Sequence, residues 1–434
     1  MWKLASLQPH RFYDRLFTPP VILWYLIFQR LQDDHTLEKV VSNAHAGGAD
    51  ALCHGLSQKI RSLATVSYSN ARQRLPGAFL RESFALQARR LLALNPQTLW
   101  HHLVLCLVDG STVRLRPYGN IARRFPPNGN QAPAAPYWCL MRVVVGFCAR
   151  SGAALACAQG SLSRSEQLLA CRMMLRRGVG ACLYIGDRNF GVFRIVQTAR
   201  ALGSQARVRL TECRARRLLG RPLRRGQYDV LWSPTSHDQL QRGCSRDPIA
   251  GRLLVVSVRR KGYRSQTLYL FTTLTDRQEF PAAELVQLYG LRWHIELNLR
   301  YLKSQMRLVQ LECKSAEMAQ KEWLAGLMAY NVIRAAMLCA ALRQKISPVL
   351  LSFSLSRRHL ELWLASFGSG TARPRQWQQL LERVGRARLP RRRQARPPEP
   401  RAQRHLRQPY PPLIGSRKKA RQQLKITPNC AHKN

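Results

Sequence analysis

The sequence has few acidic residues for its length. Its 434 residues include 23 Asp and Glu against 70 Lys and Arg, which gives a formal net charge of +47. Solubility does not require an excess of this size, so the charge indicates a polyanionic partner. The shortage of carboxylates also narrows the search for chemistry, because each Asp or Glu in an apolar setting has few competitors.

Paired cysteines and long apolar runs near the N-terminus are also missing. The 12 cysteines are scattered singly, without a Cys-x-x-Cys or a paired Cys/His spacing, which argues against a zinc site and favours a reduced, cytosolic compartment. No signal peptide is apparent, and the apolar run from Val21 to Phe28 is too short to span a bilayer. We therefore expect a cytoplasmic protein without a membrane partner.

Residues 1–90 are expected to form a helical region. Pro19-Pro20 precedes an apolar run, as is typical of the first turn of a helix. The polar stretch that follows is expected to cap a second helix, at Asp33, Asp34 or Thr36. The basic segment 67–76 also has helix potential. These features predict a small helical DNA-binding region, with a helical packing domain as the alternative because no helix-turn-helix signature is present.

Residues 98–211 alternate between strand and helix patterns. The apolar run 103–108 predicts a buried strand that ends at Asp109-Gly110, with 111–115 as its hairpin partner. Further strands are predicted over 140–149, 153–158, 181–185 and 205–210, and helices over 163–177 and 192–201, the first opening on a Ser163–Glu166 capping box. Hairpin strands followed by helix–strand units are typical of an α/β core with a mixed sheet.

Three regions follow this first part of the core. Residues 212–275 lose the helical pattern and are rich in strands, which predicts a β-rich insertion. Residues 276–345 return to helix and would form the second part of the core. Residues 346–434 begin as helices and become rich in Arg and Pro from Pro390. We interpret this basic end as an arm that contacts a polyanion, with a solvated tail as the alternative.

The stretch from Tyr289 to Lys303 carries the most unusual pattern in the chain. Read as one continuous α-helix, it places leucine and isoleucine side chains on one face. The adjoining face carries one carboxylate among cations and a phenol, namely Tyr289, Arg292, Glu296, Arg300 and Lys303. Taken alone, this pattern also fits a salt-bridged surface helix.

Two aspartates stand at the ends of predicted strands. Asp109 and Asp187 each follow a short apolar run, which is where an open α/β sheet places functional side chains, although both also fit ordinary turns. Glu296 adds a third carboxylate, from a helix expected to pack on the same sheet. Three carboxylates at one sheet edge are costly unless they bind a hard cation such as Mg²⁺. Two such ions serve phosphoryl transfer, and the other polar side chains of the 289–303 face would then hold phosphate oxygens.

At these positions the sequence resembles a known family. Tyr289-x2-Arg292-x3-Glu296-x6-Lys303 matches the Y-x2-R-x3-E-x6-K signature of the IS4-family DDE transposases. Four further segments agree with the same family: Leu107-Val-Asp109-Gly-Ser-Thr, Gly186-Asp187-Arg188-Asn-Phe-Gly191, Leu270-Phe-Thr-Thr-Leu-Thr-Asp276 and Arg407-Gln-Pro-Tyr410-Pro-Pro-Leu413. The family often has a basic residue where this chain has Gly290, so one phosphate contact is in doubt. The likeness runs over most of the chain.

The resemblance implies a fold and a mechanism. The fold is an RNase H-like core interrupted by a β-rich insertion between the second aspartate and the glutamate. Asp109, Asp187 and Glu296 would be the catalytic residues and would hold two Mg²⁺ ions, with Mn²⁺ as a possible substitute. Water would free a 3′-OH at the element's end, this hydroxyl would form a hairpin, and the reopened end would join target DNA without a covalent protein–DNA intermediate. The residues expected to contact DNA are Tyr289, Arg292, Arg300 and Lys303.

The resemblance also implies partners and a location. The partners are the transposon ends and the target DNA, bound by a homodimer, in the bacterial cytoplasm at the nucleoid. An aromatic residue would stack on a flipped base near the hairpin, with Trp232, Trp293 and Tyr263 as candidates that otherwise serve packing.

Three other functions stay open at this point. One is another two-metal RNase H-like nuclease, and a second is a catalytically inactive, transposase-derived DNA-binding protein. The third is a basic architectural nucleic-acid binder, which accounts for the charge but not for the three carboxylates.

Overall fold

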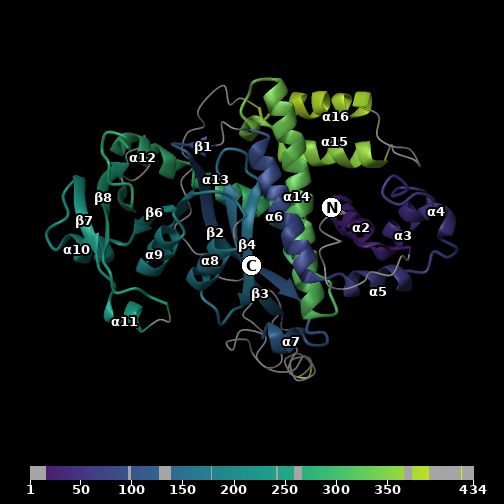
Figure 1. Cartoon of the computed structure of the whole chain (residues 1–434), viewed down its shortest axis with the longest axis horizontal. Helices are drawn as coiled ribbons and strands as arrows, with labels where there is room; N and C mark the ends of the chain where they lie inside the picture. Colours follow the sequence, from purple (N-terminus) through teal and green to yellow (C-terminus); the bar gives the residue numbers. More distant parts are fainter. Residues whose placement is uncertain are drawn as a thin grey trace, which may run out of the picture.

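A ten-stranded mixed sheet forms the centre of the computed structural model (Figure 1). The structure describes residues 16–95, 99–126, 138–176, 178–240, 243–258, 266–365, 374–390 and 422. The strands are β1 Leu99–Trp100, β2 Leu103–Leu115, β3 Cys139–Cys148, β4 Ala154–Ser161, β5 Cys182–Gly186, β6 Gln205–Leu210, β7 Gly226–Trp232, β8 Ile249–Val258, β9 Gln266–Thr272 and β10 Gln310–Leu311.

The order and direction of five strands define the core. β4, β3 and β2 form an antiparallel meander, and β5 and β6 then lie parallel to β2, in the order β4-β3-β2-β5-β6. The parallel strands are buried on both faces, with one hydrophobic cluster on each side of the sheet. This arrangement confirms the predicted α/β class with an RNase H-like mixed-sheet core.

The strands predicted as an insertion continue the same sheet. β9 pairs antiparallel with β6, and β8 and β7 follow, so the segment adds three strands to the edge of the core. The buried Arg252 of β8 ties the segment to the chain beyond it by donating to the carbonyls of Leu274 (2.6 Å) and Phe280 (2.7 Å). The expected loss of helix at residue 212 is wrong, because Thr211 caps a helix over Glu212–Leu219. That helix is short and mostly polar, so its apolar pattern is faint.

Helices cover both faces of the sheet. Their bounds are α2 Pro19–Leu31, α3 Leu37–His45, α4 Leu56–Lys59, α5 Val66–Arg74, α6 Gly77–Ala93, α7 Ile121–Arg124, α8 Glu166–Leu175, α9 Phe193–Ala201, α10 Glu212–Leu219, α11 Ser236–Gln239, α12 Ala282–Gly290, α13 Trp293–Arg300, a π-helix Tyr301–Gln305, α14 Ala316–Arg343, a 3₁₀-helix Pro348–Leu350, α15 Phe353–Ala365 and α16 Pro374–Arg386. In the N-terminal region α2 has prolines in its first turn and Thr36 caps α3, both as predicted. Tyr263 and the segments 391–421 and 423–434 lie outside the described residues.

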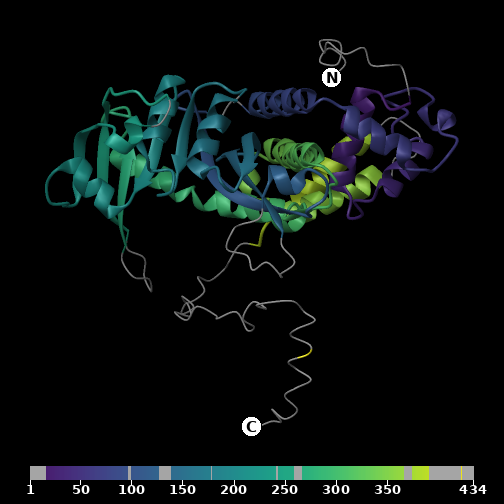
Figure 2. The same ribbon diagram turned by 90° about the horizontal axis from the view of Figure 1, so that it is seen from below.

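The long helix α14 crosses the middle of the molecule, and α2, α6, α15 and α16 all pack against it (Figure 1). Seen from below, the insertion strands and the N-terminal helices lie at opposite ends of the molecule (Figure 2). Among the described residues, only α14 is long and apolar enough to cross a membrane, but 83% of its most apolar window is buried within the structure. Its apolar character therefore has a packing explanation.

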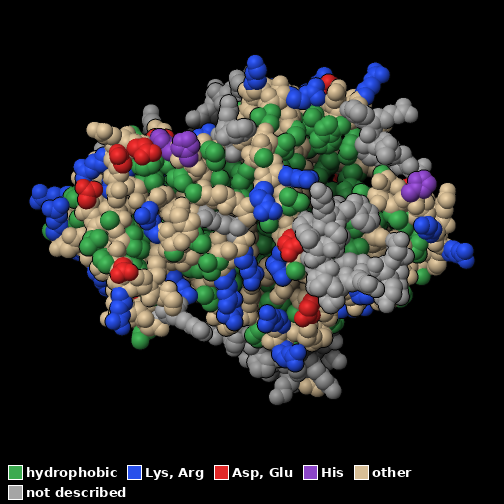
Figure 3. Space-filling view, viewed as in Figure 1, with side chains coloured by type: hydrophobic (Ala, Val, Ile, Leu, Met, Phe, Trp, Pro, Cys, Tyr) green, Lys and Arg blue, Asp and Glu red, His purple; other side chains and the backbone are tan. Residues whose placement is uncertain are grey.

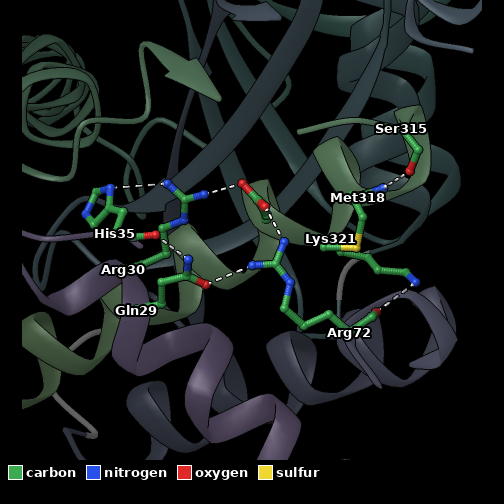
Figure 4. A network of polar contacts seen from close by, with 8 residues as sticks. Gln29, Arg30, His35, Arg72, Ser315, Met318 and Lys321 are labelled. Atoms are coloured by element: carbon green, nitrogen blue, oxygen red, sulfur yellow. Dashed lines mark hydrogen bonds and ion pairs between the residues drawn. The ribbon is translucent and has the colours of Figure 1, made fainter. Parts of the chain in front are cut away.

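A buried ion cluster fixes the N-terminal helices to α14 (Figure 4). Glu322 of α14 accepts from Arg30 of α2 and from Arg72 of α5, the second at 2.8 Å. All three side chains are buried. Burial raises the pKa of Glu322, but the two guanidinium groups outweigh it and hold the pKa below its usual range. Gln29 and Lys321 complete the cluster, with Arg72 donating to Gln29 Oε1 (3.0 Å) and Lys321 to the carbonyl of Gln73 (2.7 Å).

The turn predicted at Asp109-Gly110 and the helix cap predicted at Ser163 are both wrong. β2 runs through Asp109 and Gly110 without a turn, since it pairs with β3 from Cys106 to Leu115. The hairpin closes on the distant β3 instead of on residues 111–115. The capping box is also absent, because Ser165 is the N-cap of α8 and accepts from the backbone N–H of Leu168 (3.2 Å).

Candidate active site

Asp109 lies within β2, and Asp187 directly follows β5, the parallel strand beside it. The pairing of β2 with β5 ends at Val108 and Gly186, and each aspartate is the next residue in the chain. Both are half-buried. Asp109 accepts from the backbone N–H of Gly110 (2.8 Å), and Asp187 accepts from that of Asn189 (2.8 Å). The sheet therefore brings these two carboxylates together at one edge, as the sequence predicts.

The carboxylates at this edge affect the pKa of Asp109. Burial raises the pKa of Asp109 to about 6, and the charges of Asp187 and Glu166 add to the rise. The N–H of Gly110 and the guanidinium of Arg292 act in the opposite direction without cancelling it. Three carboxylates are thus close enough to affect one another, and a cation at this edge would relieve their repulsion.

The stretch 289–303 is helical but is not one α-helix. α12 ends at Gly290, the backbone N–H groups of Leu291 and Arg292 bond three residues back, and α13 then begins at Trp293. Glycine is a poor helix former, which accounts for an end at this point. Residues 301–305 form a π-turn. The predicted apolar face survives these irregularities, since Leu288, Ile295, Leu299 and Leu302 are all buried.

Glu296 is engaged by its own helix. Arg292 donates to Glu296 Oε1 at 2.7 Å. Burial lowers the pKa of Arg292, but the bond to Glu296 and the charges of Tyr289, Glu296 and Asp187 raise it overall. Within the described ranges, no three His, Cys, Asp or Glu side chains are gathered closely enough to hold an ion. Asp109 and Asp187 fit a hard cation because their carboxylates are oxygen donors at the same edge of the sheet. Glu296 is also an oxygen donor, but its carboxylate faces Arg292.

Tyr289 is less accessible than the sequence suggests. It is 8% exposed, and its ring lies 5.6 Å from the guanidinium carbon of Arg207. Burial raises the pKa of Tyr289, against the charges of Arg292 and Arg209. Its role as a DNA contact stays a prediction, and it would require the surrounding side chains to move.

Two arginines of β6 join this site although the sequence reading did not select them. Arg207 pairs in register with Ile185, so Arg209 follows directly beside the end of β5 and Asp187. Arg207 is fully buried, and burial lowers its pKa to about 9. The signal that marks them is their spacing: two cations alternate with apolar residues on a central strand, which places both on the face that carries Asp187.

The remaining predicted contacts lie at the surface of the α13 region. Arg300 and Lys303 are both exposed. Of the aromatic candidates for base stacking, Trp293 is 55% exposed, whereas Trp232 is buried with its ring 4.7 Å from that of Phe271. Trp232 is therefore a packing residue, and Trp293 is the aromatic available beside the site within the described part of the chain.

Comparisons with known proteins identify the family of the chain. A family model described as "Transposase DDE domain" matches residues 100–332, which is more than half of the chain. The chain is 26% identical over 357 residues to the transposase InsG for insertion sequence element IS4 of Escherichia coli (strain K12), a match that covers 77% of this chain and 74% of that protein. A chain from the cryo-EM structure of a piggyBac transposase synaptic complex with hairpin DNA aligns with a TM-score of 0.39 and 8% identity, over 88% of this chain and 80% of that one. The chain belongs to the DDE transposase family, as a transposase of the IS4 type.

Proposed function

We propose that this transposase cuts and joins DNA at the ends of an IS4-type insertion sequence by metal-dependent phosphoryl transfer. The observation that carries the proposal is the placement of Asp109 and Asp187 side by side, directly after the last paired residues of the parallel strands β2 and β5. α13 packs against β2 and brings Arg292 and Glu296 to the same face. Carboxylates and cations together at one sheet edge suit a phosphodiester substrate better than either group alone.

Asp109, Asp187 and Glu296 are the residues that would hold Mg²⁺, with Mn²⁺ as a substitute. Two bound ions would activate an attacking oxygen and stabilise the leaving oxygen of the phosphodiester. Arg292 bonds only Oε1 of Glu296, so the glutamate can join the aspartates through Oε2 or by giving up that bond. In the second case the guanidinium is released to hold a phosphate oxygen.

The DNA contacts are assigned to the polar residues around α13. Arg300 and Lys303 are exposed and positioned for the phosphate backbone, and Arg209 offers a further cation from the sheet. Lys and Arg side chains are spread over the visible face of the molecule, and acidic ones are few (Figure 3). This charge fits a long polyanionic partner such as the transposon ends and the target.

The proposed reaction follows the order implied by the family likeness. Water frees a 3′-OH, the hydroxyl forms a hairpin, and the reopened end joins target DNA within a homodimer. Trp293, exposed three residues before Glu296, is the aromatic that we assign to stacking on a flipped base.

The N-terminal helices are proposed to bind DNA as well. A cleft of about 730 Å³ between α4 and α5 is lined by Lys59, Arg61 and Arg74 together with the polar Asn70. The lining also includes the apolar Leu16, Phe17, Cys53 and Ala71, and the three cations of the cleft suit a phosphate backbone. The domain limits given above (1–90, 98–211, 212–275, 276–345 and 346–434) stay part of this proposal.

The test is DNA cleavage with the sequences that flank the gene. Purified wild-type protein, Asp109→Asn, Asp187→Asn and Glu296→Gln are incubated with labelled linear DNA carrying those flanks, with and without Mg²⁺, and products are separated on denaturing gels. We expect wild-type protein to release the end and form the hairpin. The three variants should bind DNA normally in gel shifts and lose cleavage, because each lacks one metal ligand.

Matched controls separate site loss from charge loss. Asp247→Asn and Glu382→Gln neutralise exposed acids away from the site and should cleave at the wild-type rate. Wild-type cleavage by any of the three site variants would remove that residue from the proposal. A wild-type protein that cleaves but never joins ends to a target plasmid would indicate the alternative nuclease, and one that binds without cleaving would indicate an inactive relative.

A further inference from the structure

A carboxylate that the proposed reaction does not use lies beside Gly110 and is bonded to Asn189, two residues after Asp187. Glu166 is the first residue of α8, on the opposite face of the sheet from the side chain of Asp109. It reaches the site because Gly110 has no side chain: a Cβ built at Gly110 would lie 2.5 Å from Cδ of Glu166 and 2.6 Å from its Oε1. The glycine in the middle of β2 thus leaves room for the glutamate.

Glu166 is bonded to the loop that carries Asp187. Asn189 Nδ2 donates to Glu166 Oε2 at 2.6 Å. The backbone N–H of the same Asn189 donates to Asp187 Oδ1 at 2.8 Å. Asn189 therefore connects Glu166 to a carboxylate of the site by two hydrogen bonds, one of them strengthened by the charge of the glutamate.

The neighbouring residue of α8 holds the same asparagine. Gln167 Nε2 donates to Asn189 Oδ1 (2.7 Å) and to its carbonyl oxygen (3.0 Å). These bonds fix which way the Asn189 amide faces, since its oxygen accepts from Gln167 and its nitrogen donates to Glu166. Helix capping does not account for Glu166, because Ser165 performs that role.

The other side of the loop is fixed by α10 and β6. Arg214 Nη1 donates to the carbonyl of Gly191 (3.0 Å), and a Cβ at Gly191 would lie 2.2 Å from the carbonyl oxygen of Arg209. With α10 on one side and α8 on the other, the loop has little freedom at Asp187. A metal ligand held in this way is already oriented before the ion binds.

We propose that Glu166 is a positioning residue that orients Asp187 for metal binding through Asn189. The proposal rests on the proposed function above and extends it, since it assigns a fourth carboxylate to the site without making it a ligand. Loss of such an outer partner lowers metal affinity by about ten- to a hundred-fold in metal sites generally. The chemistry itself keeps its groups, so the cleavage rate at saturating metal should change much less.

The test is a Mg²⁺ titration of cleavage by Glu166→Ala, Asn189→Ala, the double variant and Glu166→Gln. Glu166→Ala should raise the half-saturating Mg²⁺ concentration about ten-fold or more, with the saturated rate within a few-fold of wild type. Asn189→Ala should do the same, and the double variant should be no worse than either single one, because the two residues act through one bond. Glu166→Gln can still accept from Asn189 and should recover most of the affinity.

A second readout does not depend on activity. Mn²⁺ binding to the full-length protein, measured by titration calorimetry, should weaken in Glu166→Ala by the same factor, with Glu382→Gln as a wild-type control. An unchanged Mg²⁺ requirement in Glu166→Ala would overturn the proposal, as would a Glu166→Gln variant as impaired as Glu166→Ala, since that result would make the carboxylate a direct ligand. Failure of the proposed function has a different signature, namely cleavage by Asp187→Asn.

Discussion

At the scale of single residues, the site is a balance between one glutamate and several cations. Arg292 bonds Glu296 in this structure and is also close enough to Asp187 for the charge of that aspartate to raise its pKa. The same guanidinium can therefore serve the protein before DNA binds and a phosphate afterwards. Lys303 is exposed and has no such second role in the structure.

The phosphate contact proposed for both residues gives a prediction for the salt dependence of DNA binding. Arg292→Ala and Lys303→Ala should each weaken end processing and lower the slope of log Kd against log salt by about 1, because each removes one phosphate contact. Fluorescence anisotropy with an end-containing duplex over a range of NaCl concentrations measures the slope. Lys345→Ala, at the exposed end of α14, is the control. An unaltered slope would count against a phosphate contact at that position.

The sequence predicts single residues correctly where their chemistry is unusual for their surroundings. It predicts them wrongly where a residue type has a common local use, such as a turn or a helix cap. Asp109 and Asp187 are recognisable because few acids compete with them beside apolar runs. Gly110 and Glu166 were assigned to a turn and a cap, which are the common local uses of these residue types. In the structure Gly110 leaves room for Glu166, and no local sequence pattern shows that these two distant residues meet. The β6 arginines are a missed signal of a different kind, since their alternation is visible in the sequence.

At the scale of elements, α13 is held in place by a buried arginine. Arg334 of α14 donates to Asn298 Oδ1 of α13 (2.7 Å) and to the hydroxyl of Tyr330 (2.8 Å). Its guanidinium also lies 5.5 Å from the ring centre of Tyr301 and 5.1 Å from that of Phe353. Asn298 lies two residues beyond Glu296, so the orientation of the glutamate depends on this arginine.

Removal of this arginine should loosen the helix that carries Glu296. Arg334→Met should lower the free energy of unfolding by about 3 kcal/mol, from the lost charged hydrogen bonds and the desolvated cation–π contacts. Urea unfolding measures the stability, and hydrogen exchange of residues 293–300 reports α13 itself. Arg343→Met, at the exposed end of the same helix, should leave both unchanged. Protection of α13 equal to that of wild type would show that Arg334 does not hold it.

Sequence patterns identified most elements and missed their irregularities. The strands of the core and insertion and the helix α14 appear close to their predicted positions, because buried apolar runs are strong signals. The break after Gly290 and the π-turn at 301–305 were not predicted, since the helical wheel of 289–303 assumes constant winding. The relative angle of Lys303 and Glu296 is therefore set by tertiary packing.

At the scale of the whole molecule, one buried ion cluster joins the N-terminal helices to the core, beside the apolar packing of α2 and α6 on α14. Arg30 and Arg72 share Glu322, and His35 lies beside Arg30, with its Nδ1 3.5 Å from the guanidinium. Burial, with the charges of Arg30 and Arg307, lowers the pKa of His35 to about 4. Acid therefore acts on this cluster in two ways, since it charges a buried histidine and neutralises a buried glutamate.

The acid response of stability follows from the directions of these two pKa shifts. His35 binds a proton more readily in the unfolded chain, so stability should fall as pH drops from its ordinary pKa of 6.5 towards 4. The depressed pKa of Glu322 stabilises the fold above 4.5, and that contribution is lost as pH falls further. Thermal melts between pH 8 and 2 measure both effects.

Two variants separate the contributions to this acid response. His35→Gln should flatten the upper part of the profile, whereas the exposed His45→Gln should not. Glu322→Gln should cost about 3–5 kcal/mol at pH 7, because it leaves two buried guanidinium groups without a counter-charge. A profile of His35→Gln that matches wild type between pH 6.5 and 4 would assign the acid response to other groups.

Because Arg30 and Arg72 share Glu322, the order of synthesis along the chain decides when these arginines can be paired. Glu322 follows Arg72 by 250 residues and Arg30 by 292, so the ribosome completes both arginine-bearing helices long before it reaches their counter-ion. During that interval the two arginines lack the carboxylate that pairs with them in the folded protein. Completion of α14 supplies that carboxylate, so the N-terminal helices can reach their final packing only after about three quarters of the chain has been made.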